Sequence, residues 1–310
     1  MAKYRILSLD GGGIRGLITI IIMQNLAKEQ GLGSWLDKVD LIAGTSTGGI
    51  LALAIAAGVD LNEVRALYET KGKDVFDDSW LDDVLDLATI IGAEYDNKKL
   101  ARELKKVLGE GTLLGELKKS VLVTTFDLDN EDPDPARRTW KPKIFHNVAG
   151  KDNDKDVLAY KAALYTSAAP TFFPAVDGYV DGGVYANNPS MCALMQSQDT
   201  RNSVVPPMSE IVLLSLGTGA SMTYIKGKNL DWGYAQWVKP LISLMMDGVN
   251  GIADFQCKQI LGDHYHRLAP KFPPGVSIAL DDVDRVADMI KFAGSINLHS
   301  TVSWMKANWL

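Results

Sequence analysis

Short, nearly continuous apolar runs alternate with helical segments along most of the chain. We expect strands at residues 4–10, 39–45, 120–128, 143–149 and 210–218. Because these runs contain few polar positions, they are typical of strands that are covered on both faces, as in a parallel sheet. We expect helices at residues 17–30, 48–58, 61–71, 97–108, 189–198 and 284–307. The pattern therefore predicts an α/β fold in which a mostly parallel central sheet lies between two helical layers.

The sequence offers no linker that would divide the chain. The loops at 129–142 and 199–209 are short and are closely flanked by predicted strands. We therefore predict a single domain over residues 1–310, with a motif-bearing core at about 4–220 and a helical part at about 221–310. The segment 80–92 carries apolar residues at helical spacing. Packing against the core is the favoured interpretation of this segment, and a substrate lid or a lipid-contacting face is the alternative.

Charge and composition limit which classes of partner and which cellular compartment we expect for the protein. The net charge is −6 and no basic patch is evident in the sequence, which argues against nucleic acid as a partner. The two cysteines, Cys192 and Cys257, form neither a disulfide framework nor a thiolate metal cluster, and they fit a reducing compartment. A strand pattern begins within a few residues of Met1, so we expect no export signal and a cytoplasmic location. The longest apolar runs, 17–23 and 50–59, are shorter than the ~20 residues that span a bilayer, so membrane contact would be peripheral.

The stretch DGGGIRG at residues 10–16 places glycines after a predicted strand and before a predicted helix. Its G-x-G-x-x-G spacing is that of a dinucleotide site, which also needs an acidic residue at the end of the second strand. Asp40 stands instead at the beginning of that strand. A phosphate-binding P-loop is disfavoured as well, because Leu17 and Ile18 occupy the positions of its Lys and Ser/Thr.

The second predicted strand ends in GTSTGG, which places Ser46 in a G-x-S-x-G pattern before a helix. This arrangement indicates a nucleophile elbow, in which Gly44 and Gly48 leave room for a sharp turn that exposes the serine hydroxyl. A cluster of Ser and Thr residues that caps the helix is the alternative interpretation.

An acyl-transfer serine also needs hydrogen-bond donors for the oxyanion that forms when it attacks a carbonyl. The backbone amides of Gly11, Gly12 and Gly13 are candidates for this role, and Arg15 would add a fixed positive charge. A glycine-rich turn with an exposed arginine would explain this loop taken alone, but not its pairing with the elbow.

The base that would activate Ser46 is not obvious among the histidines. None of them lies in a glycine-marked loop, and we interpret them as structural: His146, His264, His266 and His299. A metal site built on His264 and His266, which would share a strand face, lacks an evident third ligand. Asp181 in DGG is the other candidate, although Asp-Gly-Gly is ordinarily a turn. Direct activation by a carboxylate requires a desolvated site that favours its neutral form.

Together, DGGGIRG, GTSTGG and DGG occur in an order that resembles the patatin-like phospholipase family, and the similarity extends through residues 165–190 and 211–219. The resemblance implies a three-layer α/β/α fold with a nucleophile elbow, and hydrolysis of lipid acyl esters through an acyl-enzyme without a metal or cofactor. It also assigns Ser46 as nucleophile, Asp181 as base, and Gly11, Gly12, Gly13 and Arg15 as the oxyanion hole.

The leading functional hypothesis is therefore a serine hydrolase that removes fatty acids from phospholipids or galactolipids, as a phospholipase A does. Its partners would be a lipid substrate at a membrane that it contacts peripherally and a small-molecule or protein activator. The alternatives are a storage or lipid-binding protein with little turnover and an effector phospholipase that a nucleotide or a partner protein switches on. A dehydrogenase is the most distant alternative, and the sequence leaves head group, acyl chain and oligomeric state open.

Overall fold

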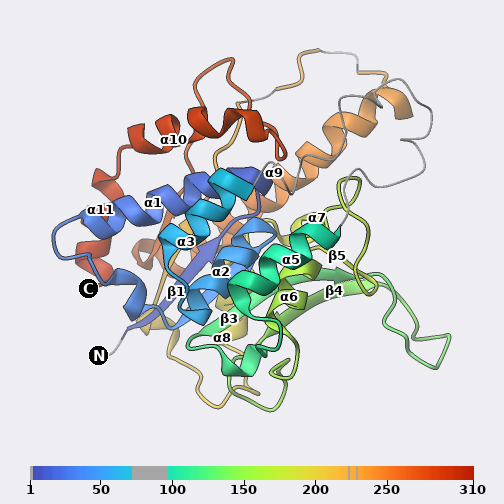
Figure 1. Cartoon of the computed structure of the whole chain (residues 1–310), viewed down its shortest axis with the longest axis horizontal. Helices are drawn as coiled ribbons and strands as arrows, with labels where there is room; N and C mark the ends of the chain where they lie inside the picture. Colours follow the sequence, from blue (N-terminus) through green and yellow to red (C-terminus); the bar gives the residue numbers. More distant parts are fainter. Residues whose placement is uncertain (1–2, 72–96, 223, 228–229) are drawn as a thin grey trace.

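The computed structural model describes residues 3–71, 97–222, 224–227 and 230–310, and its centre is one twisted sheet (Figure 1). The strands of the described residues are β1 (Tyr4–Leu9), β2 (Leu41–Thr45), β3 (Ser120–Asp127), β4 (Lys141–His146), β5 (Tyr179–Asp181), β6 (Ile211–Leu216) and β7 (Tyr265–Leu268). Their order is β4-β3-β2-β1-β6-β7, and β5 also pairs with β3. All neighbours in this order are parallel except β4, which is antiparallel to β3, as is β5. The predicted mostly parallel sheet is confirmed.

Helices cover both faces of the sheet. The α-helices of the described residues are α1 (Gly16–Lys28), α2 (Thr47–Ala57), α3 (Leu61–Ala66), α5 (Asn97–Leu108), α6 (Ala159–Ser167), α7 (Gly183–Ala186), α8 (Ser190–Ser197), α9 (Tyr234–Leu261), α10 (Val286–Ser295) and α11 (His299–Asn308). Single turns are η1 (Gly13–Arg15), η2 (Trp35–Lys38), η3 (Leu67–Lys71), η5 (Leu114–Glu116), η6 (Met208–Glu210), η7 (Gly262–His264) and η8 (Val283–Arg285).

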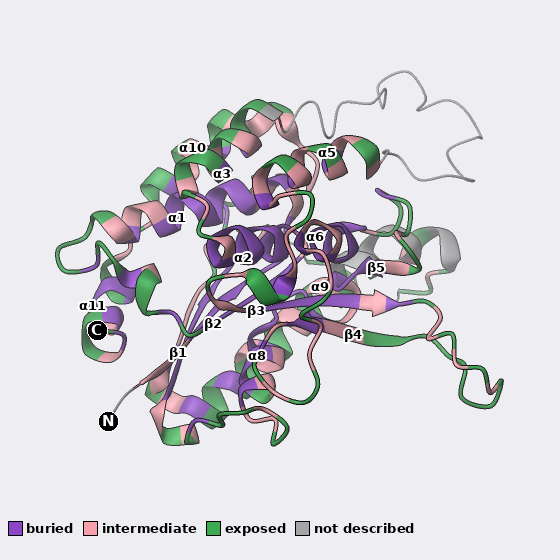
Figure 2. Ribbon diagram, turned by 60° about the horizontal axis from the view of Figure 1, so that its bottom comes forward, coloured by how far each residue is buried: buried purple, intermediate pink, exposed green. Residues whose placement is uncertain are grey.

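The three layers follow from the alternation of side chains along each buried strand. Leu7 and Leu9 of β1 join a core cluster with α1, α2, α5, α6 and α10, whereas Ile6 joins a second cluster with α8 and α9. All three side chains are fully buried. Figure 2 shows buried strands between a helical layer that contains α1, α2 and α6 and a lower layer that contains α8. A strand that is covered on both faces has no polar side, which is why its sequence is apolar throughout. The predicted three-layer α/β/α fold is confirmed.

Several elements differ from the sequence prediction. The single helix expected at 284–307 is wrong, because α10 ends at Ser295 and α11 begins at His299. Between them Ile296 is extended, and the Asn297 side chain accepts a hydrogen bond at 2.9 Å from the amide of His299, the first residue of α11. The helices α6 and α9 and the short strand β5 were not among the predicted elements.

The structure leaves two of the sequence predictions untested, namely the one for segment 80–92 and the division of the chain near residue 220. The predicted helical segment 80–92 lies outside the described residues. Among the residues that are described, no helix combines the length and apolar character needed to cross a bilayer. The division into a core at about 4–220 and a helical part at about 221–310 stays a prediction.

Candidate active site

Ser46 stands at the turn between β2 and α2 in a backbone conformation that residues other than glycine rarely adopt. Its φ is 54° and its ψ is −126°. Such a conformation costs about 1–3 kcal/mol and persists only where the surroundings hold it. The Ser46 amide donates to the Thr166 hydroxyl at 2.9 Å, and Thr166 in turn donates to the carbonyl of Thr124 on β3 at 2.7 Å. The turn is therefore tied to α6 and to the neighbouring strand.

The two glycines that flank this turn are close to backbone atoms. A Cβ on Gly44 would collide with the backbone of Gly48, and a Cβ on Gly48 would collide with the carbonyl oxygens of Leu9 and Asp10. Gly48 thus lets the first turn of α2 pack directly on the end of β1. This contact brings the Ser46 turn against the glycine loop that follows β1.

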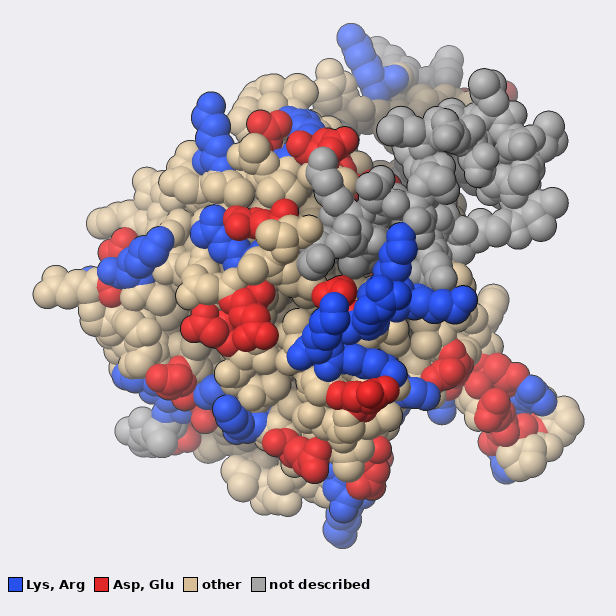
Figure 3. Space-filling model, in the orientation of Figure 1, with Lys and Arg blue, Asp and Glu red and all other residues tan. Residues whose placement is uncertain are grey.

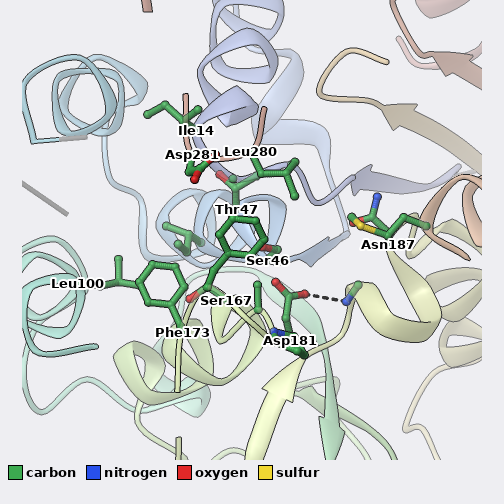
Figure 4. A pocket seen from close by; sticks show the side chains of 18 of the residues that line it. Ile14, Ser46, Thr47, Leu100, Ser167, Phe173, Asp181, Asn187, Leu280 and Asp281 are labelled. Carbon is green, nitrogen blue, oxygen red and sulfur yellow. Dashed lines mark hydrogen bonds between the residues drawn. The ribbon is translucent and has the colours of Figure 1, made fainter. Parts of the chain in front are cut away.

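Asp181 is the last residue of β5, the strand that pairs with the far end of β3. Its carboxylate is buried and accepts a hydrogen bond from the Gly183 amide at 2.7 Å. Burial raises the pKa of Asp181 to about 6, although side-chain hydrogen bonding with Ser46 and the Gly183 amide both lower it. Figure 4 shows the Ser46 and Asp181 side chains next to each other at one cavity. The structure thus brings together two residues that lie far apart in the sequence.

The glycine loop presents some of its amides to the same cavity. Gly12 and Gly13 line it, and no acceptor for either amide is recorded among the described residues. The Gly11 amide is different, because it donates to the Asn187 carbonyl at 3.0 Å and Gly11 is not part of the lining. Of the predicted oxyanion donors, Gly12 and Gly13 therefore lie at the cavity wall, whereas the Gly11 amide ties the loop to Asn187.

Arg15 does not reach the cavity. Its guanidinium donates to the carbonyl oxygens of Gly12 and Ile278, each at 3.4 Å. Burial lowers its pKa to about 10, and the charge of Asp247 opposes this shift. Arg15 thus holds the glycine loop through hydrogen bonds to carbonyl oxygens, and its side chain is not part of the cavity wall.

An ion pair fixes the beginning of the glycine loop. Asp10 follows β1 directly and is buried, and Arg267 of β7 donates to both of its carboxylate oxygens, at 3.1 and 2.6 Å. The same guanidinium donates to the Ser215 hydroxyl on β6 at 2.6 Å, so it reaches across the intervening strand. The sequence prediction missed Arg267, because nothing near it in the chain marks a partner of the glycine motif.

Asn187 is a second residue that the prediction missed. It directly follows α7, is buried, and lines the same cavity as Ser46 (Figure 4). Its amide nitrogen donates to the Asn250 side chain at 3.1 Å, whereas its side-chain oxygen has no hydrogen-bond partner. The only sequence signal was its position in the stretch YANNPS shortly after DGG.

The cavity has a volume of about 220 Å³ and a mainly apolar wall. Its apolar lining comprises Ile14, Ile50, Leu67, Leu100, Leu104, Ala169, Pro170, Phe172, Phe173, Val184, Met245, Met246 and Leu280. Its polar lining comprises Ser46, Thr47, Tyr68, Glu103, Ser167, Asp181, Asn187 and Asp281. An apolar cavity with a few converging polar groups suits a hydrocarbon chain attached to one reactive polar group.

The histidines do not contribute to this cavity in the part of the chain that the structure describes. His266 of β7 hydrogen-bonds the Thr301 hydroxyl at 2.9 Å and stacks on Trp304. His264 lies in η7 before the strand begins, so the expectation that it shares a strand face with His266 is wrong. Over the described ranges, no group of three His, Cys, Asp or Glu side chains is placed to hold a metal ion.

Comparisons with known proteins identify sequence relatives of the chain. The family model of the patatin-like phospholipases matches residues 7–194. A cGAMP-activated phospholipase of Pseudomonas aeruginosa is 31% identical over 92% of this chain and 83% of its own length. The putative sporulation hydrolase CotR of Bacillus subtilis is 27% identical over 100% of this chain and 99% of its own length. A mouse 85/88 kDa calcium-independent phospholipase A2 is 30% identical over 90% of this chain but only 36% of its own length.

Among solved structures, VipD from Legionella pneumophila aligns with 94% of this chain and 67% of its own, at 11% identity and a TM-score of 0.42. ExoU from Pseudomonas aeruginosa, in complex with SpcU, aligns with 84% of this chain and 53% of its own, at 14% identity and a TM-score of 0.35. The family model covers more than half of the chain, including the glycine loop, the Ser46 turn and Asp181. The chain therefore belongs to the patatin-like phospholipase family, and it is a lipid acyl hydrolase.

Proposed function

We propose that the protein cleaves fatty acyl esters of phospholipids or galactolipids with Ser46 as nucleophile and Asp181 as the only base. The observation that carries this proposal is that the Ser46 and Asp181 side chains meet at the wall of one apolar cavity (Figure 4). A nucleophile within hydrogen-bonding reach of its base is the arrangement that covalent catalysis requires.

The proposed reaction has two halves. In the first, the Ser46 oxygen attacks the ester carbonyl carbon while Asp181 takes the hydroxyl proton. The Gly12 and Gly13 amides donate to the oxyanion of the tetrahedral intermediate. The intermediate expels the alcohol part of the lipid, which leaves with the proton from Asp181, and the acyl group stays on Ser46. In the second half, water attacks the acyl-enzyme and gives its proton to Asp181, the fatty acid departs, and Ser46 recovers its hydroxyl proton.

A lone carboxylate is suited to this role only when its pKa is raised. A carboxylate whose pKa is the ordinary 3.8 is too weak a base to accept the proton of a serine hydroxyl. Burial brings the pKa of Asp181 to about 6, close to the pH at which a cytoplasmic enzyme works. The raised value supports proton transfer in both directions within one turnover.

Release of labelled fatty acid from phospholipid vesicles tests the proposal. The wild type should release fatty acid, and Ser46→Ala should release none above background. Ser203→Ala is the matched control, because Ser203 is exposed and is absent from the cavity wall. Equal release by Ser46→Ala and the wild type would reject Ser46 as the nucleophile. A fluorophosphonate probe that fails to label Ser46 would favour the alternative of a storage or lipid-binding protein.

Control by a nucleotide is a second hypothesis, favoured by the relative named as a cGAMP-activated phospholipase. We propose that a cyclic dinucleotide or a protein partner raises the activity of this chain as well. The test is fatty acid release from vesicles with and without cGAMP. Activity that is the same at every cGAMP concentration would reject this nucleotide as the activator.

We also propose that the protein acts in the cytoplasm and meets its lipid as a peripheral protein. Its two cysteines are both free, as is usual in a reducing compartment. Fractionation of cells that express the tagged chain would test this. Recovery in the exported fraction would contradict the proposal.

A further inference from the structure

Asn187 presents a buried oxygen atom at the cavity wall. The residue is 3% exposed, and its side-chain oxygen Oδ1 has no hydrogen-bond partner in the part of the chain that the structure describes. The rest of the residue is held in place. Its side-chain nitrogen donates to the Asn250 side chain on α9 at 3.1 Å, and its backbone carbonyl accepts from the Gly11 amide at 3.0 Å. Buried acceptors in proteins are nearly always paired, so we expect Asn187 Oδ1 to meet a donor that arrives with the reaction.

Two glycines locate this oxygen relative to the nucleophile and the base. A Cβ added to Gly11 would collide with Asn187 Oδ1 and come within 3.2 Å of the Ser46 Cβ, so the oxygen lies close to Ser46. A Cβ added to Gly183 would be 3.1 Å from Asp181 Oδ1 and 3.3 Å from Asn187 Oδ1. Gly183 is part of the cavity wall, and Figure 4 shows the Asp181 and Asn187 side chains at the same cavity. Because Gly183 has no side chain, it leaves free the space that these two oxygens flank.

The chemistry of an ester decides which donor can meet this oxygen. The reacting group of an ester carries only acceptor oxygens, and so does the acyl group once it is attached to Ser46. An oxyanion is also an acceptor, so Asn187 Oδ1 would repel it. Water, which enters in the second half of the reaction, carries two O–H donors on one oxygen. One of them must face the base, and the other is available to a second acceptor.

Asn250 determines which end of the Asn187 carboxamide faces the cavity. Because the Asn187 nitrogen donates to the side-chain oxygen of Asn250, the Asn187 oxygen is left on the cavity side. A carboxamide turned end over end would set its oxygen against the Asn250 oxygen, and both atoms are acceptors. Such a turned carboxamide would offer its nitrogen to the oxyanion, which is a role in the first half of the reaction. Kinetics distinguish this role from one in the second half.

We propose that Asn187 holds the water that hydrolyses the acyl-enzyme. One O–H of this water donates to the Asp181 carboxylate and the other to Asn187 Oδ1, which turns a lone pair of the water oxygen toward the acyl carbonyl carbon. The water oxygen bonds to that carbon while Asp181 takes the first proton, and the second O–H becomes the hydroxyl of the fatty acid. The bond between the carbon and the Ser46 oxygen then breaks, and Ser46 recovers the proton from Asp181. The inference rests on the proposed function, since it requires an acyl-enzyme.

Kinetics with an activated nitrophenyl ester separate the two half-reactions. When hydrolysis of the acyl-enzyme is the slow step, kcat reports that hydrolysis and kcat/KM reports formation of the acyl-enzyme. An uncharged ester is used, because Figure 3 shows clusters of both signs on the surface, which would bind a charged ester outside the cavity. In Asn187→Leu, kcat and KM should both fall by roughly 10- to 100-fold, and kcat/KM should stay at the wild-type value. Mass spectrometry of the intact protein should find the acyl-enzyme accumulating in this variant.

A second variant removes the space for the water and leaves Asn187 in place. Gly183→Ala puts a methyl group in contact with both flanking oxygens, so it should lower kcat and keep kcat/KM in the same way. If Asn187→Leu does not fold, Gly183→Ala decides by the same criteria. Asn62→Leu is the matched control, because Asn62 is exposed and is absent from the cavity wall, and its kinetics should equal those of the wild type.

Two results would overturn the role of Asn187. In the first, kcat/KM and the rate of fluorophosphonate labelling fall as far as kcat, which would place Asn187 in the first half-reaction or in support of the fold. In the second, Asn187→Leu keeps the wild-type kcat, which would show that the water needs no second acceptor. A failure of the proposed chemistry would appear differently, as unchanged ester hydrolysis in Ser46→Ala.

Discussion

Arg267 of β7 forms a two-pronged ion pair with Asp10, the residue that joins β1 to the glycine loop. Both side chains are largely buried, and β6 lies between their strands. A buried ion pair contributes little net stability, but the loss of one partner leaves an uncompensated charge. The main effect of this ion pair is therefore to position the beginning of the glycine loop.

Arg267→Met should lower the free energy of unfolding by about 3–5 kcal/mol, because Asp10 would stay buried without its partner. Urea unfolding measures the loss. Asp10→Asn combined with Arg267→Met removes both charges and should recover most of the stability, whereas kcat should stay low if the pair positions the Gly12 and Gly13 amides. Full recovery of kcat in the double variant would show that the pair has no positioning role.

The raised pKa of Asp181 predicts a pH dependence of activity. Because Asp181 must be ionised to accept the Ser46 proton, kcat/KM for a soluble ester should rise through a pH of about 6 and level off above it. A pH profile without a step near this value would contradict the assignment of Asp181 as base.

The raised pKa of Asp181 also predicts that the stability of the folded protein decreases as the pH rises, whereas its activity increases. The folded pKa of Asp181, about 6, lies above the ordinary 3.8, so the folded protein binds more protons between these values. Its contribution to stability is complete below pH 3.8 and is lost as the pH rises through 6, by up to about 3 kcal/mol at about 1.4 kcal/mol per pKa unit. Urea unfolding of the wild type and of Asp181→Asn against pH measures it: the wild type should lose stability relative to the variant over this window. A constant difference would mean that burial does not shift this pKa.

The strained turn predicts a difference between two inactive variants. Ser46→Gly relieves the positive φ, whereas Ser46→Ala keeps it. Thermal or urea unfolding should find the glycine variant more stable by about 1–2 kcal/mol, despite the greater freedom of glycine in the unfolded chain. Equal stability would mean that the turn stores no strain.

Gly48 allows a test of how closely the elbow packs on β1. Gly48→Ala would push a methyl group into the carbonyl oxygens of Leu9 and Asp10, so we expect loss of activity and a marked drop in unfolding temperature. Gly111→Ala is the control, because a Cβ there meets nothing within 4 Å and should change neither property. An active, stable Gly48→Ala protein would contradict the close approach of the two turns.

How much of this site the sequence could predict depends on how local the signal was. The turn at Ser46 could be predicted from consecutive residues, because a strand, two glycines and a helix follow one another there. The glycine loop was likewise recognisable from seven consecutive residues. The central strands were predictable because burial on both faces leaves an uninterrupted apolar run.

The rest depended on contacts between distant parts of the chain. Taken alone, Asp181 looked like a turn residue, because β5 has only three residues and forms through its pairing with β3, and only the resemblance of the three motifs to the family assigned it as the base. Arg267 acquires its role only when β7 takes its place beside β6. The sequence predicted that the Gly11 amide could donate to an oxyanion, but in the folded chain this amide donates to the Asn187 carbonyl.

The activation of Ser46 by Asp181 is tested most directly by the rate at which a fluorophosphonate labels Ser46, followed by mass spectrometry of the intact protein. The account predicts that the wild type is labelled faster as the pH rises through about 6, and that folded Asp181→Asn protein is labelled at least ~10²-fold more slowly at pH 8. Labelling of folded Asp181→Asn at the wild-type rate would contradict it.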